Sequence, residues 1–284
     1  MTDINKTNSA KTETFDKEKW IADKNADLTN AYAMIEETLT DMKEDISVLP
    51  KILDVIARFE KMSIANNLLI AHQKSNATRL MDTNSIKSTG GYINKGARGI
   101  ILLEAGNEFT RKDGSTGRRI NTHKMFDISQ TSLSVISRDP VRYDIRYIMK
   151  AIISNAPCVV EVVRELPDQQ DVLYLPHEQK IMLKERIIAQ DSFRSVAEGM
   201  AYAYGDRDQI EVTPFTAYCT AFTICAKYNV GNWDFDYSKV PENFTSESSK
   251  DLRAQLNKIR VLTKEIAYDM AKTLDIQPYS KGGR

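Results

Sequence analysis

Histidine and cysteine are scarce in this sequence. Its 284 residues include three histidines, His72, His123 and His177, and three cysteines, Cys158, Cys219 and Cys225. No two cysteines form a C-x-x-C pair and their number is odd, so we expect buried, reduced thiols. With three scattered histidines, few residues could serve as the general base of a Ser/His or Cys/His catalytic group.

Long apolar runs are also missing. No window approaches the roughly eighteen apolar residues of a membrane span, and the amino-terminal segment has no apolar signal-peptide core. We therefore expect a cytosolic protein, since 42% hydrophobic and 27% charged residues are typical of ordinary globular chains. The length allows one large or two ordinary domains, and the changes of pattern along the chain favour two.

The glycine and serine patterns of common enzyme sites do not occur. Gly90, Gly91, Gly96 and Gly99 fit neither G-x-x-x-x-G-K-[ST] nor G-x-G-x-x-G, the spacings with which phosphate loops hold nucleotides. There is no G-x-S-x-G nucleophile elbow. A pair of carboxylates could meet in the fold, but the sequence selects no pair among its 39 acidic residues.

The chain does contain a local excess of positive charge on a neutral background. Between Ser85 and Lys124 there are eight Lys/Arg and three Asp/Glu, whereas the whole chain has 39 of each kind. Clustered cations are typical of a surface that contacts phosphates. A solvated polar hairpin is the alternative interpretation.

The same stretch predicts a β-hairpin. Asp113-Gly114 and the Ser-Thr-Gly that follows indicate a turn between two short strands. Alternate side chains of a strand share a face, so one set is expected to point inward and the cations to lie near the tip. The inward set is Ile101, Leu103, Ile120 and Phe126, and the tip cations are Arg111, Lys112, Arg118 and Arg119.

Two aromatic residues, Tyr92 and Phe109, accompany these cations. Cations for phosphates and aromatic faces for bases are the combination used in sequence-independent binding of single strands. Core packing of either ring is the alternative.

Apolar spacing and capping residues predict the remaining elements. Helices are expected from Asp27 to Met42, near Pro50 to Phe59, from a Ser63 cap to Gln73, and from Val141 to Ile152. Three more are expected from an Asp191 or Ser192 cap to a stop at Gly205, from Pro214 to Tyr228, and from Ser248 to Leu274. Strands are expected at 159–163, 172–175 and 181–183, and a break at Asp139-Pro140.

The helix after these strands stands where a zinc peptidase would carry H-E-x-x-H. Two histidines four residues apart face the same way and bind the metal, and the glutamate activates water. Here the first and last positions are Ala197 and Ala201, which offer no donor atom, and only Glu198 is kept. His177-Glu178 begins like the motif, but Ile181 follows where the second histidine is needed and the segment is typical of a turn. The sequence therefore predicts no metal site.

A series of short motifs runs through the amino-terminal half. They are Ser63-x-x-Asn66, Leu68-Leu-Ile70, Gln73, Ala77-Thr78, Gly91-Tyr-Ile-Asn-Lys-Gly96 through Gly99-Ile100, and Phe126-Asp-Ile-Ser-Gln-Thr131. In order and approximate spacing they resemble the single-stranded-DNA-binding domain of the ArdC antirestriction and LtrC-like family of plasmids and conjugative elements. Met62 replaces an aromatic residue of the family, and the family's tryptophan is missing from Asp82–Ser85.

This resemblance implies an α+β fold in which amino-terminal helices with a small β-sheet precede a mostly helical zincin-like domain with a short β-sheet. The expected organisation is a disordered tail over 1–26, a single-stranded-DNA-binding domain over 27–138, and a metallopeptidase-related domain without the metal motif over 139–284. The expected DNA-binding residues are Ser63, Asn66, Gln73, Thr78, Tyr92, Lys95, Arg98, Arg111, Lys112, Arg118, Arg119 and Lys124.

The expected function is that of a non-catalytic, cofactor-free accessory protein that binds single-stranded DNA for a mobile element, in conjugative transfer or antirestriction. Conjugation or restriction proteins are the expected protein partners. Two alternatives remain open. One is a protein-interaction module that docks on that machinery, with a basic hairpin that is merely solvated, and the other is a metallopeptidase with atypical ligands.

Overall fold

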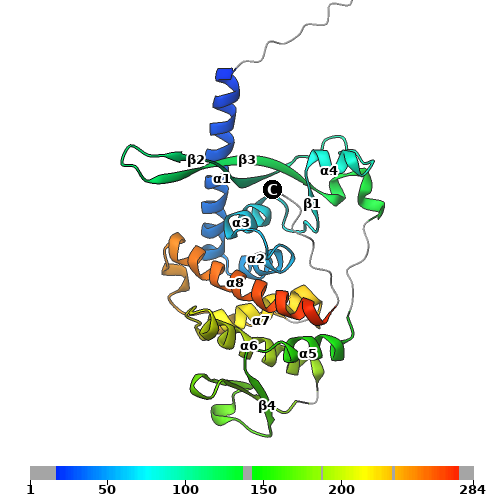
Figure 1. The fold of residues 1–284 in the computed structure, drawn as a ribbon, viewed down its shortest axis with the longest axis vertical. Coiled ribbons are helices and arrows are strands. Elements are labelled where there is room, and N and C mark those ends of the chain that lie inside the picture. Colours follow the sequence, from blue (N-terminus) through cyan, green and yellow to red (C-terminus); the bar gives the residue numbers. More distant parts are fainter. Residues whose placement is uncertain (1–16, 137–142, 187, 232–233, 275–284) are drawn as a thin grey trace, which may run out of the picture.

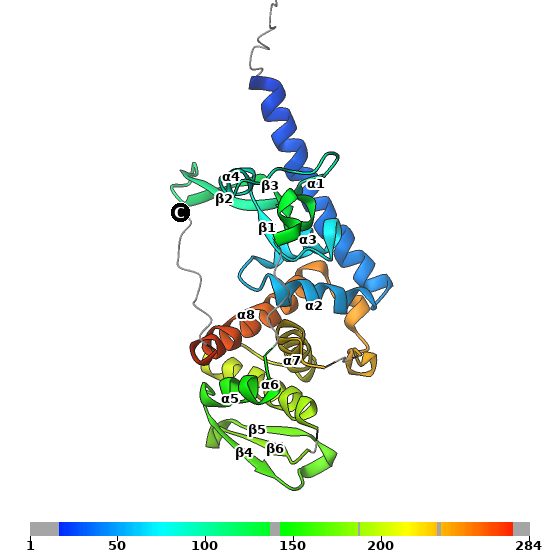
Figure 2. The ribbon, with the colours of Figure 1, turned by 90° about the vertical axis from the view of Figure 1, so that its right-hand side faces the viewer.

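Two groups of helices, each with a three-stranded sheet, make up a computed structural model of the chain (Figures 1 and 2). The structure describes residues 17–136, 143–186, 188–231 and 234–274. The predicted α+β fold class is confirmed. No helix within these ranges is both long enough and apolar enough to cross a bilayer.

The first group contains four helices and a sheet with the strand order β1-β3-β2, in which both pairings are antiparallel. Its helices are α1 (Lys17–Glu44), α2 (Val48–Arg58), α3 (Ile64–Lys74) and α4 (Thr83–Ser88). Its strands are β1 (Leu80–Met81), β2 (Ile100–Thr110) and β3 (Thr116–Asp127), and two short 3-10 helices, Ile128–Gln130 and Ser132–Ile136, follow them.

The second group has a sheet of order β4-β6-β5, where β6 is parallel to β4 and antiparallel to β5. Its strands are β4 (Val159–Val163), β5 (Val172–Leu175) and β6 (Lys180–Lys184). Its helices are α5 (Ile145–Ser154), α6 (Ala189–Arg207), α7 (Pro214–Tyr228) and α8 (Ser249–Thr273). Short 3-10 turns occur at Pro167–Gln169, Pro176–Glu178, Tyr237–Lys239 and Phe244–Ser246.

Several predicted helix starts are confirmed by their caps. The hydroxyls of Ser63, Thr213 and Ser248 each accept a hydrogen bond from a backbone amide in the first turn of α3, α7 and α8, respectively. Such a bond satisfies one of the amides that a helix start leaves without a partner. These three boundaries are therefore set by local chemistry that the sequence displays.

Two helix boundaries differ from the prediction. The tail expected over 1–26 is helical from Lys17 onward, and residues 1–16 lie outside the described ranges. Helix α6 begins at Ala189 and continues through Gly205 to Arg207, so Gly205 does not stop it. A Cβ on Gly205 would lie 2.3 Å from Cγ2 of Val212, so glycine is needed there for close packing and not for a left-handed turn.

Buried side chains form two large cores. The first contains residues of α1, α2, α3 and β2, and it also includes Phe215 of α7 and Leu252 and Leu256 of α8. The second lies among α5, α6, α7, α8 and β6. Residues 137–142, which include the expected domain boundary near 138 and the Asp139-Pro140 break, lie outside the described residues. The first core nevertheless draws on both sides of that boundary.

Both faces of the start of β2 contact the first core. Ile100 and Leu102 are buried, and Ile101 and Leu103, which were expected to point inward, are half-buried and pack against that core. All residues from Ile100 to Leu103 are apolar, so alternation does not reveal which pair is the more buried. The expectation was wrong for Ile120, which is 40% exposed, whereas Phe126 packs against a third, small core around Met81, Ile86, Ile128 and Leu133.

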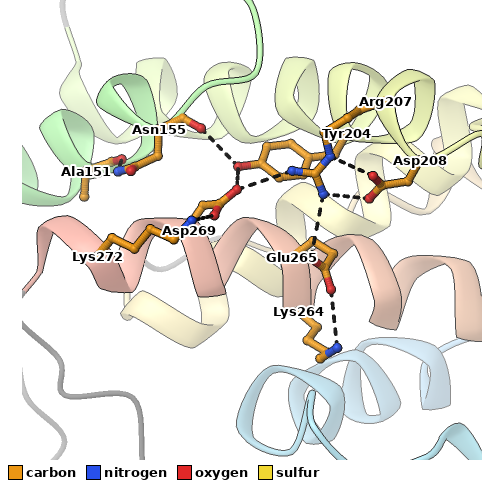
Figure 3. A network of polar contacts seen from close by, with 9 residues as sticks. All are labelled: Ala151, Asn155, Tyr204, Arg207, Asp208, Lys264, Glu265, Asp269 and Lys272. Atoms are coloured by element: carbon orange, nitrogen blue, oxygen red, sulfur yellow. Dashed lines mark hydrogen bonds and ion pairs between the residues drawn. The ribbon is translucent and has the colours of Figure 1, made fainter.

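A polar network joins α5, α6 and α8 around the buried Tyr204 (Figure 3). Its hydroxyl donates a hydrogen bond of 2.7 Å to Asp269 and lies 3.2 Å from the carbonyl of Asn155. Burial and the bond to Asp269 raise the pKa of Tyr204, and the Arg207 guanidinium lies 4.4 Å from the ring centroid. The network orients three helices in the second group, so we assign it to the fold.

Candidate nucleic-acid interface

The β2–β3 hairpin extends beyond the helices as an arm (Figure 1). Near its tip the guanidinium carbons of Arg111 and Arg119 each lie 5.9 Å from the ring centroid of Phe109. The ring lies over Gly117, where a Cβ would come within 2.8 Å of it. Phe109 therefore positions two arginines by cation–π contact on one face of the arm, and its ring is only 39% exposed.

Two of the predicted cations are partnered by carboxylates. Arg118 lies 2.6 Å from Glu108, and Lys124 lies 3.4 Å from Asp27 of α1. By contrast, no described carboxylate is within salt-bridge distance of the five other predicted cations, all of them exposed, which are Lys95, Arg98, Arg111, Lys112 and Arg119. These five can contact phosphates without first losing a carboxylate partner.

The loop before β2 displays Tyr92, Lys95 and Arg98 at the base of the arm. The Tyr92 ring is 69% exposed, while its backbone is fixed by two hydrogen bonds with Ser132, of 3.0 and 2.9 Å. The loop also donates from the Asn94 amide to the carbonyl of Gln130. A rigid backbone with an open ring suits base stacking, because little conformational freedom is lost on binding.

Asp127, the last residue of β3, ties the segment before β1 to the end of this strand. Its carboxylate is 1% exposed and accepts hydrogen bonds from the backbone amides of Thr78, Arg79 and Ser129 at 2.6, 2.9 and 3.0 Å. Burial raises the pKa of Asp127, but these bonds and one from the Ser129 hydroxyl outweigh burial and hold it below its ordinary value. Thr78, predicted to bind DNA, thus donates its backbone amide to the buried carboxylate of Asp127.

Asn66 and Gln73, also predicted to bind DNA, hydrogen-bond to β2. The Asn66 amide brackets Leu103, donating to its carbonyl at 2.9 Å and accepting from its amide at 2.8 Å. Gln73 brackets Ile101 in the same way, at 2.9 and 2.8 Å. Strand β2 is an edge of its described sheet, so the two side chains satisfy backbone groups that an edge leaves open. Ser63, the third predicted DNA-binding residue of this region, is the N-cap of α3, the helix that carries Asn66 and Gln73.

A groove of about 990 Å³ lies between α1, the end of α3 and the start of β2. Of the predicted residues, it brings together Gln73 and Arg98, and it adds residues that the sequence did not single out, among them Asn30, His72, Lys74 and Asn76. No sequence signal connects these segments, because the groove exists only once α1 crosses the sheet beside α3. The tip cations are not part of it.

Helix α6 does not fit a zincin-type metal site. Ala197 and Ala201, at the two ligand positions, are fully buried in the second core. Among the residues that the structure describes, no three His, Cys, Asp or Glu side chains are grouped as metal ligands would be. Burial raises the pKa of Glu198, the retained glutamate, and burial together with the nearby Glu198 raises the pKa of Tyr202 to about 12.

Comparison with known proteins identifies solved structures with a similar fold. No protein-family model matches the sequence, and a search of curated proteins finds no match. Among solved structures, the metal-free antirestriction protein ArdC from plasmid R388 matches with a TM-score of 0.51 and 14% identity, over 73% of this chain and 85% of that one. Its Mn(II)-bound structure matches with a TM-score of 0.50 and 14% identity, over 76% and 84%. The chain therefore has the fold of the ArdC antirestriction protein.

Proposed function

We propose that this protein binds single-stranded DNA without sequence preference, as a non-catalytic antirestriction or transfer accessory of a plasmid or related element. The observation that carries the proposal is the set of five exposed cations without carboxylate partners among the described residues, beside the open ring of Tyr92. Cations neutralise phosphates, and an exposed ring can stack on any base.

The shared fold supports the biological setting of this proposal. The structural neighbour is described as an antirestriction protein of plasmid R388. Carried over to this chain, that setting makes an incoming single strand the natural ligand, and restriction or conjugation proteins the natural protein partners. Both transfers are part of the proposal.

The proposal assigns no catalysis to the second group of helices. Its support is the chemistry of α6, where buried alanines occupy the positions at which a zincin would place its ligands. A protein-interaction role for this half is the second candidate function. Val159 and Val162 of the edge strand β4 favour it, because they are 61% and 63% exposed.

Fluorescence anisotropy with a labelled 20-nucleotide single strand tests the proposal. Replacing Arg111 and Arg119 together by serine should weaken binding, and the slope of log affinity against log salt should become shallower by about 0.7 for each phosphate that is no longer neutralised. Tyr92→Ala should weaken binding by about 1–3 kcal/mol and leave the salt slope unchanged, because stacking releases no counterions.

Arg146→Ser on α5 is the matched control, since Arg146 is exposed and its helix belongs to the second group. Melting temperatures should be equal for all variants, because every replaced side chain is exposed. Equal affinity of the parent and the Arg111/Arg119 variant at every salt concentration would reject the arm as a DNA contact. Absence of single-strand binding by the parent would reject the function and favour the interaction role.

A further inference from the structure

The groove beside α3 has an unusual charge composition. Its 13 lining residues include three basic side chains, His72, Lys74 and Arg98, and no carboxylate. Glu37 of α1 lies 3.6 Å from the far nitrogen of His72 but does not line the groove. In a chain with equal numbers of acidic and basic residues, a groove without carboxylates favours an anionic ligand.

The carbonyl groups at the carboxyl end of α3, which would repel an anion, already accept hydrogen bonds. The carbonyls of Ser75 and Ala77 both accept hydrogen bonds from the guanidinium of Arg58. Arg58, which also pairs with Asp54 at 2.8 Å, thus occupies two carbonyl groups at the end of α3. A phosphate near this helix end therefore meets carbonyls that already accept hydrogen bonds.

The polar side chains of the groove divide into committed and available groups. Gln73 is used in bracketing Ile101, and Gln130 bonds the backbone of Arg98 and of Asp127. The side chains of Arg98 and Asn30 are exposed, and within the described ranges neither makes a side-chain hydrogen bond. The ammonium of Lys74 lies 3.2 Å from the amide oxygen of Asn76, which leaves its other donors available.

We infer that this groove binds one nucleotide unit of a single strand. The phosphate lies between Arg98 and Lys74, and the base lies over the apolar floor formed by Met34, Ala71 and Ile100. The amides of Asn30 and Asn76 offer both donors and acceptors, so bases of different pattern can be accommodated. The inference rests on the proposed function, because it takes single-stranded DNA as the ligand and shares Arg98 with the five cations that carry that proposal.

The separation between groove and tip makes the inference testable. Strand β2 runs 11 residues from the groove to the tip, and its ten steps of about 3.3 Å span about 33 Å. A trinucleotide at about 3.4 Å per stacked base spans about 10 Å. It can therefore occupy the groove or the tip, but it cannot bridge them.

The experiment measures binding of the trinucleotide dT3 by chemical-shift titration and of the 20-nucleotide dT20 by anisotropy, with the full chain. Asn30→Trp fills the groove, and Arg98→Ser removes its phosphate contact. Each should weaken dT3 binding at least about tenfold, Arg98→Ser because one charge-assisted contact is lost and Asn30→Trp because the indole occupies the space of the nucleotide. Asn25→Trp on the same helix and Arg146→Ser are the matched controls, and both should bind dT3 as the parent does.

The outcomes separate the two claims. If the parent binds dT20 but not dT3, or if Asn30→Trp and Arg98→Ser bind dT3 as tightly as the parent, the groove inference is overturned while the proposed function stands. If the parent binds neither oligonucleotide, the proposed function itself fails. Loss of dT3 binding in both groove variants, with parental melting temperatures and intact controls, supports the groove as a nucleotide site.

Discussion

The ammonium of Lys227, near the end of α7, lies 3.0 Å from the carboxylate of Glu60, just beyond the end of α2. Glu60 is 7% exposed, and Arg260 of α8 donates to its backbone carbonyl at 3.1 Å. Lys227 also lies 3.4 Å from the carbonyl of Ala57. Two cations from the second group of helices therefore meet the negative end of a helix in the first group.

Removing one partner of this pair should destabilise the protein. Lys227→Met leaves a nearly buried carboxylate without its counter-ion, and we expect a loss of about 2–4 kcal/mol in the free energy of unfolding, measured by urea titration. Lys258→Met is the control, because Lys258 pairs at 3.2 Å with Glu211, whose side chain is 83% exposed. That change should cost about 0.5 kcal/mol or less. Equal losses of stability in both variants would show that the Lys227–Glu60 pair stabilises the protein no more than an exposed ion pair does.

A fragment that ends at residue 138 should not fold cooperatively. The first core needs Phe215, Leu252 and Leu256, and α2 packs against α7. The fragment would therefore expose the apolar face that these helices cover in the whole chain. Circular dichroism of the fragment should show helix without a sharp thermal transition. A cooperative transition near that of the full chain would instead support the division at 138 as a domain boundary.

Histidines placed at the two zincin ligand positions should destabilise the protein and bind no metal. Ala197 and Ala201 are fully buried, so an imidazole at each must displace core side chains, at about 1–3 kcal/mol per site. Elemental analysis of the parent and of the Ala197→His/Ala201→His variant should find no stoichiometric zinc or manganese. Ala254→His, on the exposed face of α8, should melt like the parent. A metal bound in equal amount to the protein would contradict this account of α6.

The stability of the protein should depend on the ionisation of Glu198. Burial raises its pKa above the ordinary value of 4.5, so the unfolded chain loses this proton at lower pH than the native protein does. Stability conferred by the protonated form is present below pH about 4.5 and is lost as pH rises through the raised pKa. Glu198→Gln should therefore raise the melting temperature at neutral pH more than at acid pH. The exposed Glu242→Gln serves as the control, and an equal effect of Glu198→Gln at both pH values would contradict the assignment.

Asn66 should prove to be a residue of the fold. Asn66→Ala removes both hydrogen bonds to Leu103 and leaves its backbone groups without partners, so we expect a loss of about 1–3 kcal/mol in stability. Affinity for dT20, measured well below the melting temperature, should stay at the parental value. Tyr92→Ala should show the reverse pattern, with weaker binding and unchanged melting. Weaker binding by Asn66→Ala at parental stability would return this residue to the DNA contacts.

Sequence reasoning succeeded where the determining chemistry is local. The starts of α3, α7 and α8 follow from Ser63, Thr213 and Ser248, and the hairpin turn follows from Asp113-Gly114. It was wrong where packing decides. Gly205 is a residue type typical of helix ends, but α6 continues through it to Arg207, and the glycine instead gives Val212 room to pack closely.

The candidate site was predictable in its residue types but not in its arrangement. Exposed cations and Tyr92 could be identified from charge and aromatic content, and the structure separates them into an arm tip and a loop at its base. The amides of Asn66 and Gln73 look like ligand contacts in a sequence, whereas they bracket an edge strand. The groove joins Asn30, Lys74 and Arg98, whose proximity no sequence pattern encodes.

The shared first core also has a consequence for synthesis on the ribosome. Helices α2 and α3 leave the ribosome early, but Leu252, Leu256 and Ile259, which complete their core, are translated last. At about 5–20 residues per second, the apolar faces around Phe59 wait roughly 10–40 s for these partners. During that interval the nascent chain exposes the apolar surface that Leu252, Leu256 and Ile259 cover in the folded protein.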